Sequence, residues 1–198
     1  MQGIDGHPAW AADLAIDAIP EMAWTLLADG VARAAAPFHT PVLATQADDG
    51  PDLRTVVLRA ADYKSRLLLC HTDLRSPKLR QISLDKRVRW LFYDAAAKVQ
   101  LRMQATASLH QGDELATQRW AASRERSRAC YRNPFAPGTS VTSPETAIEL
   151  VKEDGFANFA VIRSEVQAFD WLFLRAKGHR RAHFTWQDGS WQGSWLAP

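Results

Sequence analysis

Arg54-Thr55-Val56-Val57-Leu58-Arg59 is the stretch that decides the fold of this chain. Its β-branched and aliphatic residues predict a strand, residues 53–60, which returns from a strand at 41–46 across the turn Asp48-Asp49-Gly50. Alternate residues of a strand face opposite sides, so Arg54 and Arg59 do not share a face. They can still reach one elongated ligand that lies over a barrel end or between two subunits. The alternative interpretation is an edge strand with flanking charges.

A second stretch, His71-Thr72-Asp73-Leu74-Arg75-Ser76-Pro77-Lys78, follows closely. It predicts the end of a strand at 66–71 and the start of a helix that runs to about residue 84, with Ser76 as N-cap and Pro77 in the first helical position. Thr72, Ser76 and Lys78 then lie close together. Cations, hydroxyls and free N–H groups at a helix start hold phosphate, so this stretch predicts a phosphate site, although Ser76 alone is equally well explained as a cap.

The remaining chain predicts a mainly β, α+β fold with flanking helices. Further strands are expected at 87–93, 99–110, 156–162, 166–174, 180–186 and 190–196, with a loop at 133–143. Helices are expected at 9–35, divided by Pro20, and within 111–129. Short hairpin connections favour an antiparallel meander or barrel over parallel βαβ units.

Composition narrows the class of protein. The 198 residues fit one domain, and a net charge of +2 gives no reason to expect general binding to nucleic acid or membrane. Neither a secretory signal nor an apolar run of membrane-spanning length is visible, so a reducing, cytoplasmic setting is expected.

Of the two cysteines, Cys70 lies in an apolar run and is expected in the core. The histidines have no metal-ligand spacing, and no metal site is expected.

The two stretches, taken with Val99-Gln100-Leu101-Arg102-Met103, resemble the pyridoxamine 5′-phosphate oxidase-like family in order and spacing. Members of that family are FMN-binding split β-barrels with a Greek-key-like antiparallel sheet. The resemblance covers residues 40–110 well, and the C-terminal Trp191…Trp195-Leu196-Ala197-Pro198 resembles the family's ending more loosely. It implies one FMN-binding split-barrel domain over residues 1–198, with the helical segment 1–36 packed on the barrel.

The resemblance also implies roles for individual residues. Arg54 and Lys78 would hold the FMN phosphate, with Thr72 and Ser76 adding hydrogen bonds and His71 beside them. The segment Thr55, Val56, Val57, Leu58 and Arg59 would pass along the flavin. Gln100 would bind the flavin from the second subunit of a homodimer that has FMN at its interface, and Arg181 or Arg180 would reach the flavin ring.

Departures from the family pattern bear on activity. Pro77 stands where the family has an arginine, which removes one cation from the phosphate site. The family's substrate-phosphate signature Tyr-x-x-x-Arg-x-x-x-Ser has its nearest equivalent in Trp120…Arg124…Arg128, which places Arg128 at the serine position. These changes argue against assuming vitamin B6 oxidation.

Two hypotheses therefore follow. The first is an FMN-dependent oxidoreductase that passes a hydride from an unidentified small molecule to the flavin. No side chain need be an acid or base, so no catalytic residue is assigned. The second is a protein of the same fold that carries flavin, haem or deazaflavin without catalysis. A structural domain that has lost its cofactor is a weaker third alternative, because the cofactor-type residues occur together.

Overall fold

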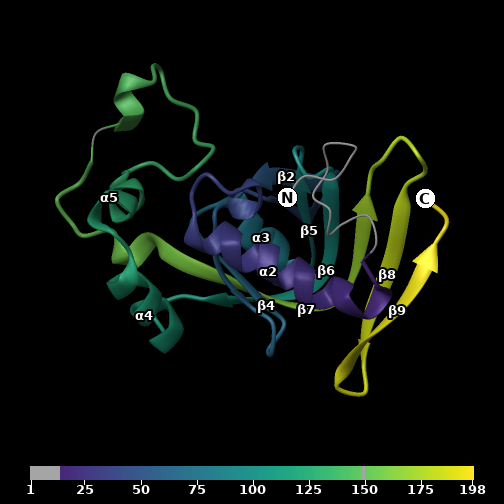
Figure 1. Ribbon diagram of the computed structural model, residues 1–198. Coiled ribbons are helices and arrows are strands. Elements are labelled where there is room, and N and C mark those ends of the chain that lie inside the picture. Colours follow the sequence, from purple (N-terminus) through teal and green to yellow (C-terminus); the bar gives the residue numbers. More distant parts are fainter. Residues whose placement is uncertain (1–13, 149) are drawn as a thin grey trace.

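The computed structural model describes residues 14–148 and 150–198, in which nine strands form one antiparallel sheet (Figure 1). The strands are β1 Val42–Ala47, β2 Gly50–Thr55, β3 Leu58–Asp62, β4 Leu67–Asp73, β5 Arg87–Asp94, β6 Val99–His110, β7 Phe159–Phe173, β8 Arg180–Gln187 and β9 Ser190–Leu196. The described α-helices are α2 Ile19–Ala32, α3 Pro77–Leu84, α4 Glu114–Ala122 and α5 Glu125–Arg128. Strands predominate, which confirms the mainly β class with flanking helices.

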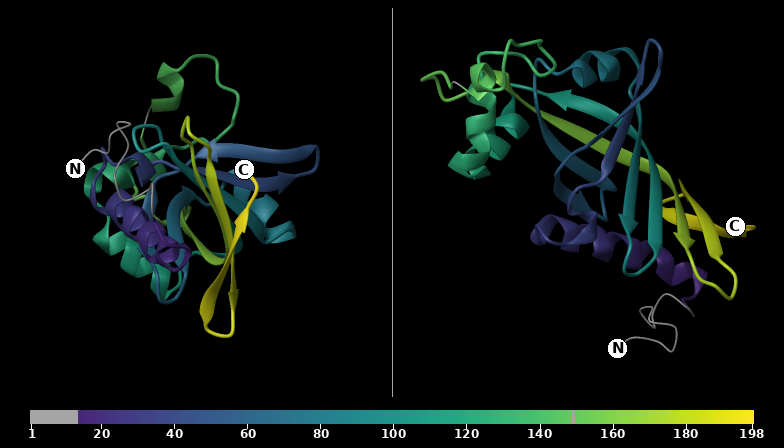
Figure 2. Two further views of the ribbon diagram at one scale, coloured as in Figure 1. Left: turned by 45° about the vertical axis from the view of Figure 1, so that its right-hand side comes forward. Right: turned by 90° about the horizontal axis from the view of Figure 1, so that it is seen from above.

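The strands are arranged as a split barrel with Greek-key-like order. Along the sheet they run β2-β1-β5-β6-β7-β4-β3, with β8 added on β7 and β9 on β8. The long strand β7 holds the parts together: its first half pairs with β4, its second half with β8, and nearly all of it with β6. Figures 1 and 2 show the β8–β9 hairpin at one end of the molecule and α4 and α5 at the other.

The prediction of one continuous strand at 53–60 is wrong. The chain breaks at Val56-Val57, so that β2 pairs with β1 while β3 pairs with β4. At the break the Val56 N–H donates to the carbonyl of Pro41, the residue before β1, at 2.9 Å, one position beyond the last pair of the β1–β2 ladder. The physical reason is that β2 and β3 lie at opposite ends of the strand order, so the chain must leave one half of the barrel to enter the other.

The opposite correction applies to 156–174. The two strands predicted there are one strand, β7, preceded by the 3-10 turn Phe156–Asn158. A bulge at Gln167, which has no partner between the pairs Ala105–Val166 and Gln104–Ala168, bends the strand without ending it. Conversely, the predicted helix at 111–129 is interrupted between α4 and α5, and the loop at 133–143 is confirmed.

The N-terminal helix α2 packs on the barrel through buried Ile19, Ala23, Trp24 and Leu27. The predicted division at Pro20 is only partly described, because residues 9–13 lie outside the described part. What the structure shows is a 3-10 turn, Ile16–Ala18, followed by α2 with Pro20 in its first turn, where a missing N–H costs nothing.

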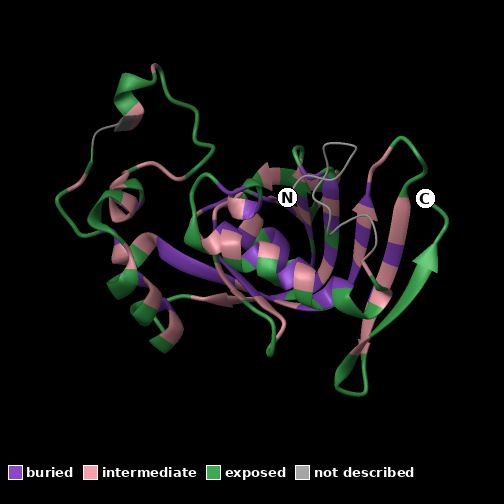
Figure 3. Ribbon diagram, in the orientation of Figure 1, coloured by how far each residue is buried: buried purple, intermediate pink, exposed green. Residues whose placement is uncertain are grey.

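Two apolar clusters fill the molecule. Figure 3 colours the chain by burial and shows buried positions along β7 and in α2. The main cluster fills the barrel and includes Cys70, which is fully buried, as expected. The second lies under α4 and joins Leu69, Trp120, Tyr131, Phe159 and Val161. Because Trp120 anchors α4 in this second cluster, the polar residues of α4 are held beside β3 and β4.

Candidate functional site

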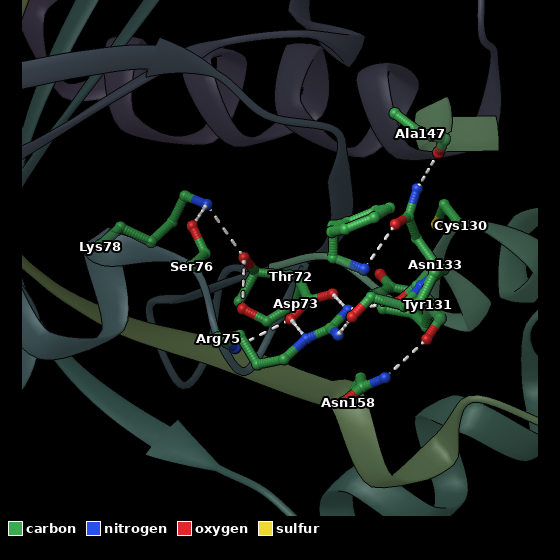
Figure 4. Close-up of polar contacts among 12 residues, drawn as sticks. Thr72, Asp73, Arg75, Ser76, Lys78, Cys130, Tyr131, Asn133, Ala147 and Asn158 are labelled. Carbon is green, nitrogen blue, oxygen red and sulfur yellow. Dashed lines mark hydrogen bonds and ion pairs between the residues drawn. The ribbon is translucent and has the colours of Figure 1, made fainter. Parts of the chain in front are cut away.

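Lys78 forms the centre of the predicted phosphate site (Figure 4). From the first turn of α3 its Nζ donates to Thr72 Oγ1 at 3.0 Å and to Ser76 Oγ at 2.5 Å. Ser76 occupies the N-cap position but makes no capping bond with its side chain, so its hydroxyl serves Lys78 instead. The sequence therefore predicted the right neighbours, and the structure brings Thr72, Ser76 and Lys78 together.

The turn that carries these groups is tied down by Arg75. Its guanidinium bonds Asp73 and also donates to the carbonyls of Asn133 at 3.0 Å and Pro134 at 3.2 Å (Figure 4). The Leu74 N–H donates to the Asn158 carbonyl at 2.7 Å. These bonds connect the β4–α3 turn to the loop at residues 133–134 and to the turn before β7, which fixes the backbone of the predicted phosphate site.

Arg54 reaches the same region from β2. Its guanidinium donates to Thr45 Oγ1 at 2.6 Å and to Gln81 Oε1 at 3.3 Å, and it forms an ion pair with Asp52. Gln81 lies one turn after Lys78 on α3. We call the group Arg54, Thr72, Ser76 and Lys78 the phosphate clamp.

Sequence reasoning missed Thr45, Asp52 and Gln81, which orient Arg54 in the clamp. Thr45 donates to Gln81 Oε1 at 2.6 Å, and Gln81 Nε2 donates to Asp52 at 2.9 Å. Gln81 was detectable in principle, since residues three apart on a helix share a face with Lys78. Nothing in the sequence places β1 against that face.

The charges of the clamp favour an anion. Burial lowers the pKa of Lys78, and the positive charge of Arg54 lowers it further. The nearby carboxylates of Asp73 and Asp52, the second of which pairs with Arg54, act in the opposite direction but do not outweigh these two effects. A bound phosphate would favour the charged form of Lys78.

Arg59 lies apart from the clamp. It lines a second cavity of about 460 Å³, together with Val57 and His71 from the same region of the barrel. Arg119, Arg124 and Arg126 line the cavity from α4 and the chain that follows it. We call this cavity the arginine pocket; Arg119 was missed in the sequence because the phase of α4 could not be read from its weak apolar pattern.

The other members of the predicted flavin segment, residues 55–58, lie in different environments. Leu58 is completely buried in the barrel core, and Thr55 is exposed on the face of β2 opposite to Arg54. Val56 is half-buried and forms the break between the strands. Only Arg54, Val57 and Arg59 of this segment therefore present side chains to the clamp or to the arginine pocket.

Gln100 and Arg181 lie on another face. Gln100 on β6 pairs with Leu172 on β7, which pairs with Arg181 on β8, so the three form one row across the sheet. On β6 the residues that point into the barrel are Val99, Leu101 and Met103, so Gln100 points outward. Within this chain the structure does not bring Gln100 or Arg181 to the phosphate clamp.

The next row on the same face of the sheet contains an ionic network that the sequence did not reveal. This row consists of Arg102, Asp170 and His183. Asp170 on β7 accepts hydrogen bonds from His183 Nδ1 at 2.8 Å and Arg181 at 3.1 Å, and it pairs with Arg102. Burial acts to raise the pKa of Asp170, but the hydrogen bonds from His183, Arg181 and Arg102 outweigh it and lower the pKa. Arg180, the alternative to Arg181, instead donates to the Leu14 carbonyl and lies over the Trp195 ring.

Neither a metal centre nor a membrane span is found in the described part of the chain. Residues 14–148 and 150–198 contain no group of three His, Cys, Asp or Glu side chains placed to hold a metal ion. In the same residues no helix has the length and apolar character needed to cross a bilayer.

Part of the chain matches a known family model. The family model described as pyridoxamine 5′-phosphate oxidase, FMN-binding domain, matches residues 21–111, which include the clamp, Arg59, His71 and Gln100. A search of curated proteins gave no match.

Solved structures share the fold over most of the chain. A pyridoxamine 5′-phosphate oxidase-related, FMN-binding protein from Nostoc punctiforme is 20% identical, with a TM-score of 0.72 over 94% of this chain and 100% of that one. PhzG from Burkholderia lata, in complex with tetrahydrophenazine-1-carboxylic acid, is 17% identical, with a TM-score of 0.73 over 96% and 97%. The chain therefore shares the split-barrel fold of these proteins, and its residues 21–111 match the pyridoxamine 5′-phosphate oxidase FMN-binding domain model, which is consistent with a divergent member of that family.

Proposed function

We propose that this protein binds FMN and is an oxidoreductase that acts on a small molecule. The observation that carries the proposal is the convergence of Arg54 and Lys78, from β2 and α3, with two hydroxyls, inside the region that matches the FMN-binding domain. Two cations and two hydroxyl groups match the charge and the acceptor oxygens of a phosphate monoester.

Each residue of the clamp has a defined task in this proposal. Lys78 and Arg54 neutralise the phosphate, while Thr72 and Ser76 fix the position of the Lys78 ammonium. Arg75 keeps the turn rigid, so little ordering is needed when the cofactor binds. When bound, FMN would supply a ring that accepts a hydride from the substrate.

The ring would extend from the clamp past Val57 and Arg59, towards the arginine pocket. This direction follows the chain, because Val57 and Arg59 come directly after the strand that carries Arg54. His71, which directly precedes Thr72 on β4, lines the same pocket. The substrate would then bind in the arginine pocket, in contact with the exposed side of the ring.

A homodimer is part of the proposal. The outer face of the sheet carries a cavity of about 350 Å³ lined by Leu53, Leu91, Arg102 and Gln104 among others, and Leu53 is 58% exposed. Exposed apolar surface next to ordered polar rows is typical of a face that binds a partner. Gln100 and Arg181, which point away from their own chain's clamp, would reach the flavin of the second subunit.

One observation favours the alternative of a carrier without catalysis. Arg128, at the serine position of the family's substrate signature, lies over the Trp120 ring at 5.1 Å and donates to the Ala121 carbonyl at 2.8 Å. It thus serves the packing of α4 rather than the pocket. A protein that binds flavin, haem or deazaflavin without turnover would tolerate this loss.

The test is the visible spectrum of the purified protein, followed by FMN titration of the apo form. We expect a flavin spectrum, and FMN affinity that falls in Arg54→Ala but not in Arg80→Ala, a matched control on the exposed face of α3. Absence of FMN binding by the unmodified protein would contradict the proposal. Flavin binding without reduction by any candidate substrate would favour the carrier.

A further inference from the structure

Ser108, His110 and Asp113, which belong neither to the clamp nor to the arginine pocket, form a hydrogen-bonded chain at the end of β6. The Ser108 hydroxyl lies 3.0 Å from His110 Nε2, and His110 Nδ1 lies 2.7 Å from Asp113 Oδ2. Strand residues two apart share a face, so Ser108 and His110 both lie on the outer face of the sheet, opposite the core residue Ala107. A hydroxyl, an imidazole and a carboxylate joined through these two ring nitrogens have the geometry of the triad of serine hydrolases.

Asp113 fixes which nitrogen of the His110 ring carries the proton. The bond from the Ala116 N–H, at 2.9 Å, lowers the pKa of Asp113; burial acts to raise it, and the bond from His110 lowers it further. An ionised carboxylate only accepts hydrogen bonds, so Nδ1 of the neutral ring must be the protonated atom. Nε2 is then an acceptor for the Ser108 hydroxyl, and it lies closer than the alternative acceptor, the Arg163 carbonyl at 3.5 Å.

Arg163 places a positive charge beside this hydroxyl. It is the partner of Ser108 in the β6–β7 ladder, so the two side chains share the outer face with Cβ atoms about 4.5–5.5 Å apart. The half-buried Arg163 side chain has no hydrogen bond or ion pair within residues 14–148 and 150–198, because Glu165, the acid two positions along β7, pairs with Arg66. A cation without a partner next to a hydroxyl nucleophile is suited to stabilise an oxyanion that forms there.

We propose that Ser108 is an activated nucleophile that hydrolyses short carboxylic esters, a function separate from the proposed flavin chemistry. His110 is the general base, Asp113 positions and charges the ring, and Arg163 stabilises the oxyanion. Helix α4 begins directly after Asp113 and covers the neighbouring Val161, so it bounds the site on one side. A short acyl group is therefore the class that fits.

The reaction needs no co-reactant other than water. Ser108 Oγ attacks the ester carbonyl carbon while its proton moves to His110 Nε2, and the charge on the carbonyl oxygen faces Arg163. The bond to the alcohol oxygen then breaks as His110 returns the proton to that oxygen, which leaves the acyl group on Ser108. Water, deprotonated by His110, attacks the acyl carbon, and the carboxylic acid leaves as the serine takes back its proton.

A fluorophosphonate probe tests the nucleophile directly, because a reactive serine oxygen displaces fluoride and stays bonded to phosphorus. The unmodified protein should be labelled at Ser108, as located by peptide mass spectrometry, and should hydrolyse p-nitrophenyl acetate. Ser108→Ala should lose the label, and His110→Gln should slow labelling and hydrolysis by roughly a hundredfold. Thr106→Ala is the matched control, since it removes a hydroxyl from the same face of β6 that bonds Gln167 instead of a histidine, and it should change neither rate.

Asp113→Asn separates the proposed role of Asp113 from helix capping. Asparagine caps a helix as well as aspartate does, so α4 and the melting temperature should be unchanged. The asparagine amide can donate to Nδ1 and hold the ring in the wrong tautomer, so labelling should slow by about a hundredfold or more. A purely structural Asp113 would leave the labelling rate as it is.

Arg163→Gln should slow hydrolysis by roughly tenfold, and Arg163→Lys should recover part of that loss, because the oxyanion needs a donor there. Loading with FMN should not alter labelling, so failure of FMN to bind would leave this proposal standing. Absence of label at Ser108 in the unmodified protein would overturn the proposal. Equal labelling rates in His110→Gln and the unmodified protein, or hydrolysis undiminished in Ser108→Ala, would overturn it as well.

Discussion

Arg54 and Arg59 are close in sequence but serve different parts of the molecule, because the barrel splits between them. Arg54 lies on β2, against β1, and binds Thr45 and Gln81. Arg59 lies on β3, against β4, and lines the arginine pocket. One continuous strand would have placed the two charges on its opposite faces. Because the strand is broken, they lie on different strands and in two separate sites.

This division predicts different effects of the two alanine substitutions. Arg54→Ala should weaken FMN by roughly tenfold to a hundredfold, the equivalent of one charge-assisted hydrogen bond at about 1.5–3 kcal/mol. Arg59→Ala should cost much less FMN affinity, because Arg59 lies outside the clamp. Titration of both variants with FMN measures this, and equal loss of FMN affinity in the two variants would show that one site, not two, holds the arginines.

Lys78 is expected to lower the stability of the apo protein and to strengthen FMN binding. Its pKa is lowered by burial and by Arg54, so in the ligand-free protein the charged form is disfavoured relative to the unfolded chain. Between the folded and unfolded pKa values of Lys78, the unfolded chain therefore binds more protons than the folded chain. In that pH range the free energy of unfolding rises with pH. Lys78→Met should raise the melting temperature of the apo protein and abolish tight FMN binding.

The control for this prediction is Arg80→Met, which removes a cation from the exposed side of the same helix. It should change neither the melting temperature nor FMN affinity appreciably. A lower melting temperature in apo Lys78→Met would mean that the bonds to Thr72 and Ser76 outweigh the cost of burying the charge.

Local sequence was sufficient for the parts of the fold and site that depend on local signals. The Ser76-Pro77 helix start and the hairpin at Gly50 lie where propensity and turn chemistry placed them. The break at Val56-Val57 could not be predicted, because valine favours strands and only the choice of partner strand ends β2 there. Thr45 and Asp170 were missed for a related reason: their roles depend on strand register.

Asp170 is predicted to stabilise the outer face of the sheet. Its carboxylate compensates Arg102, Arg181 and His183, and it is largely buried. Asp170→Asn should lower the free energy of unfolding at pH 7 by about 1–3 kcal/mol, since the cations lose their partner. Urea denaturation measures this, with Asp188→Asn in the exposed β8–β9 turn as the control.

The pH dependence gives an independent check on Asp170. A lowered carboxyl pKa contributes stability above the unfolded value of about 3.9, and that contribution disappears as pH falls through the folded pKa. The difference in stability between Asp170→Asn and the unmodified protein should therefore shrink as pH falls below about 4. A difference independent of pH would indicate that packing, not charge, explains the effect.

Leu53 tests whether the outer face binds a second subunit. It is exposed on β2, on the strand face opposite to Arg54, and it lines the cavity beside Arg102 and Gln104. If a partner covers this face, Leu53→Lys places a charge in an apolar contact and should convert the dimer to monomer in sedimentation experiments. Because Gln100 and Arg181 would then be removed from the flavin, FMN affinity should fall although the clamp residues are unchanged.

Leu84→Lys is the matched control, because Leu84 is also exposed but lies at the end of α3, away from this cavity. It should leave the assembly state unaltered. If Leu53→Lys stays dimeric with full FMN affinity, the partner does not cover this face. Monomeric Leu53→Lys that retains full FMN affinity would show instead that each chain completes its own site, and that Gln100 and Arg181 have another role.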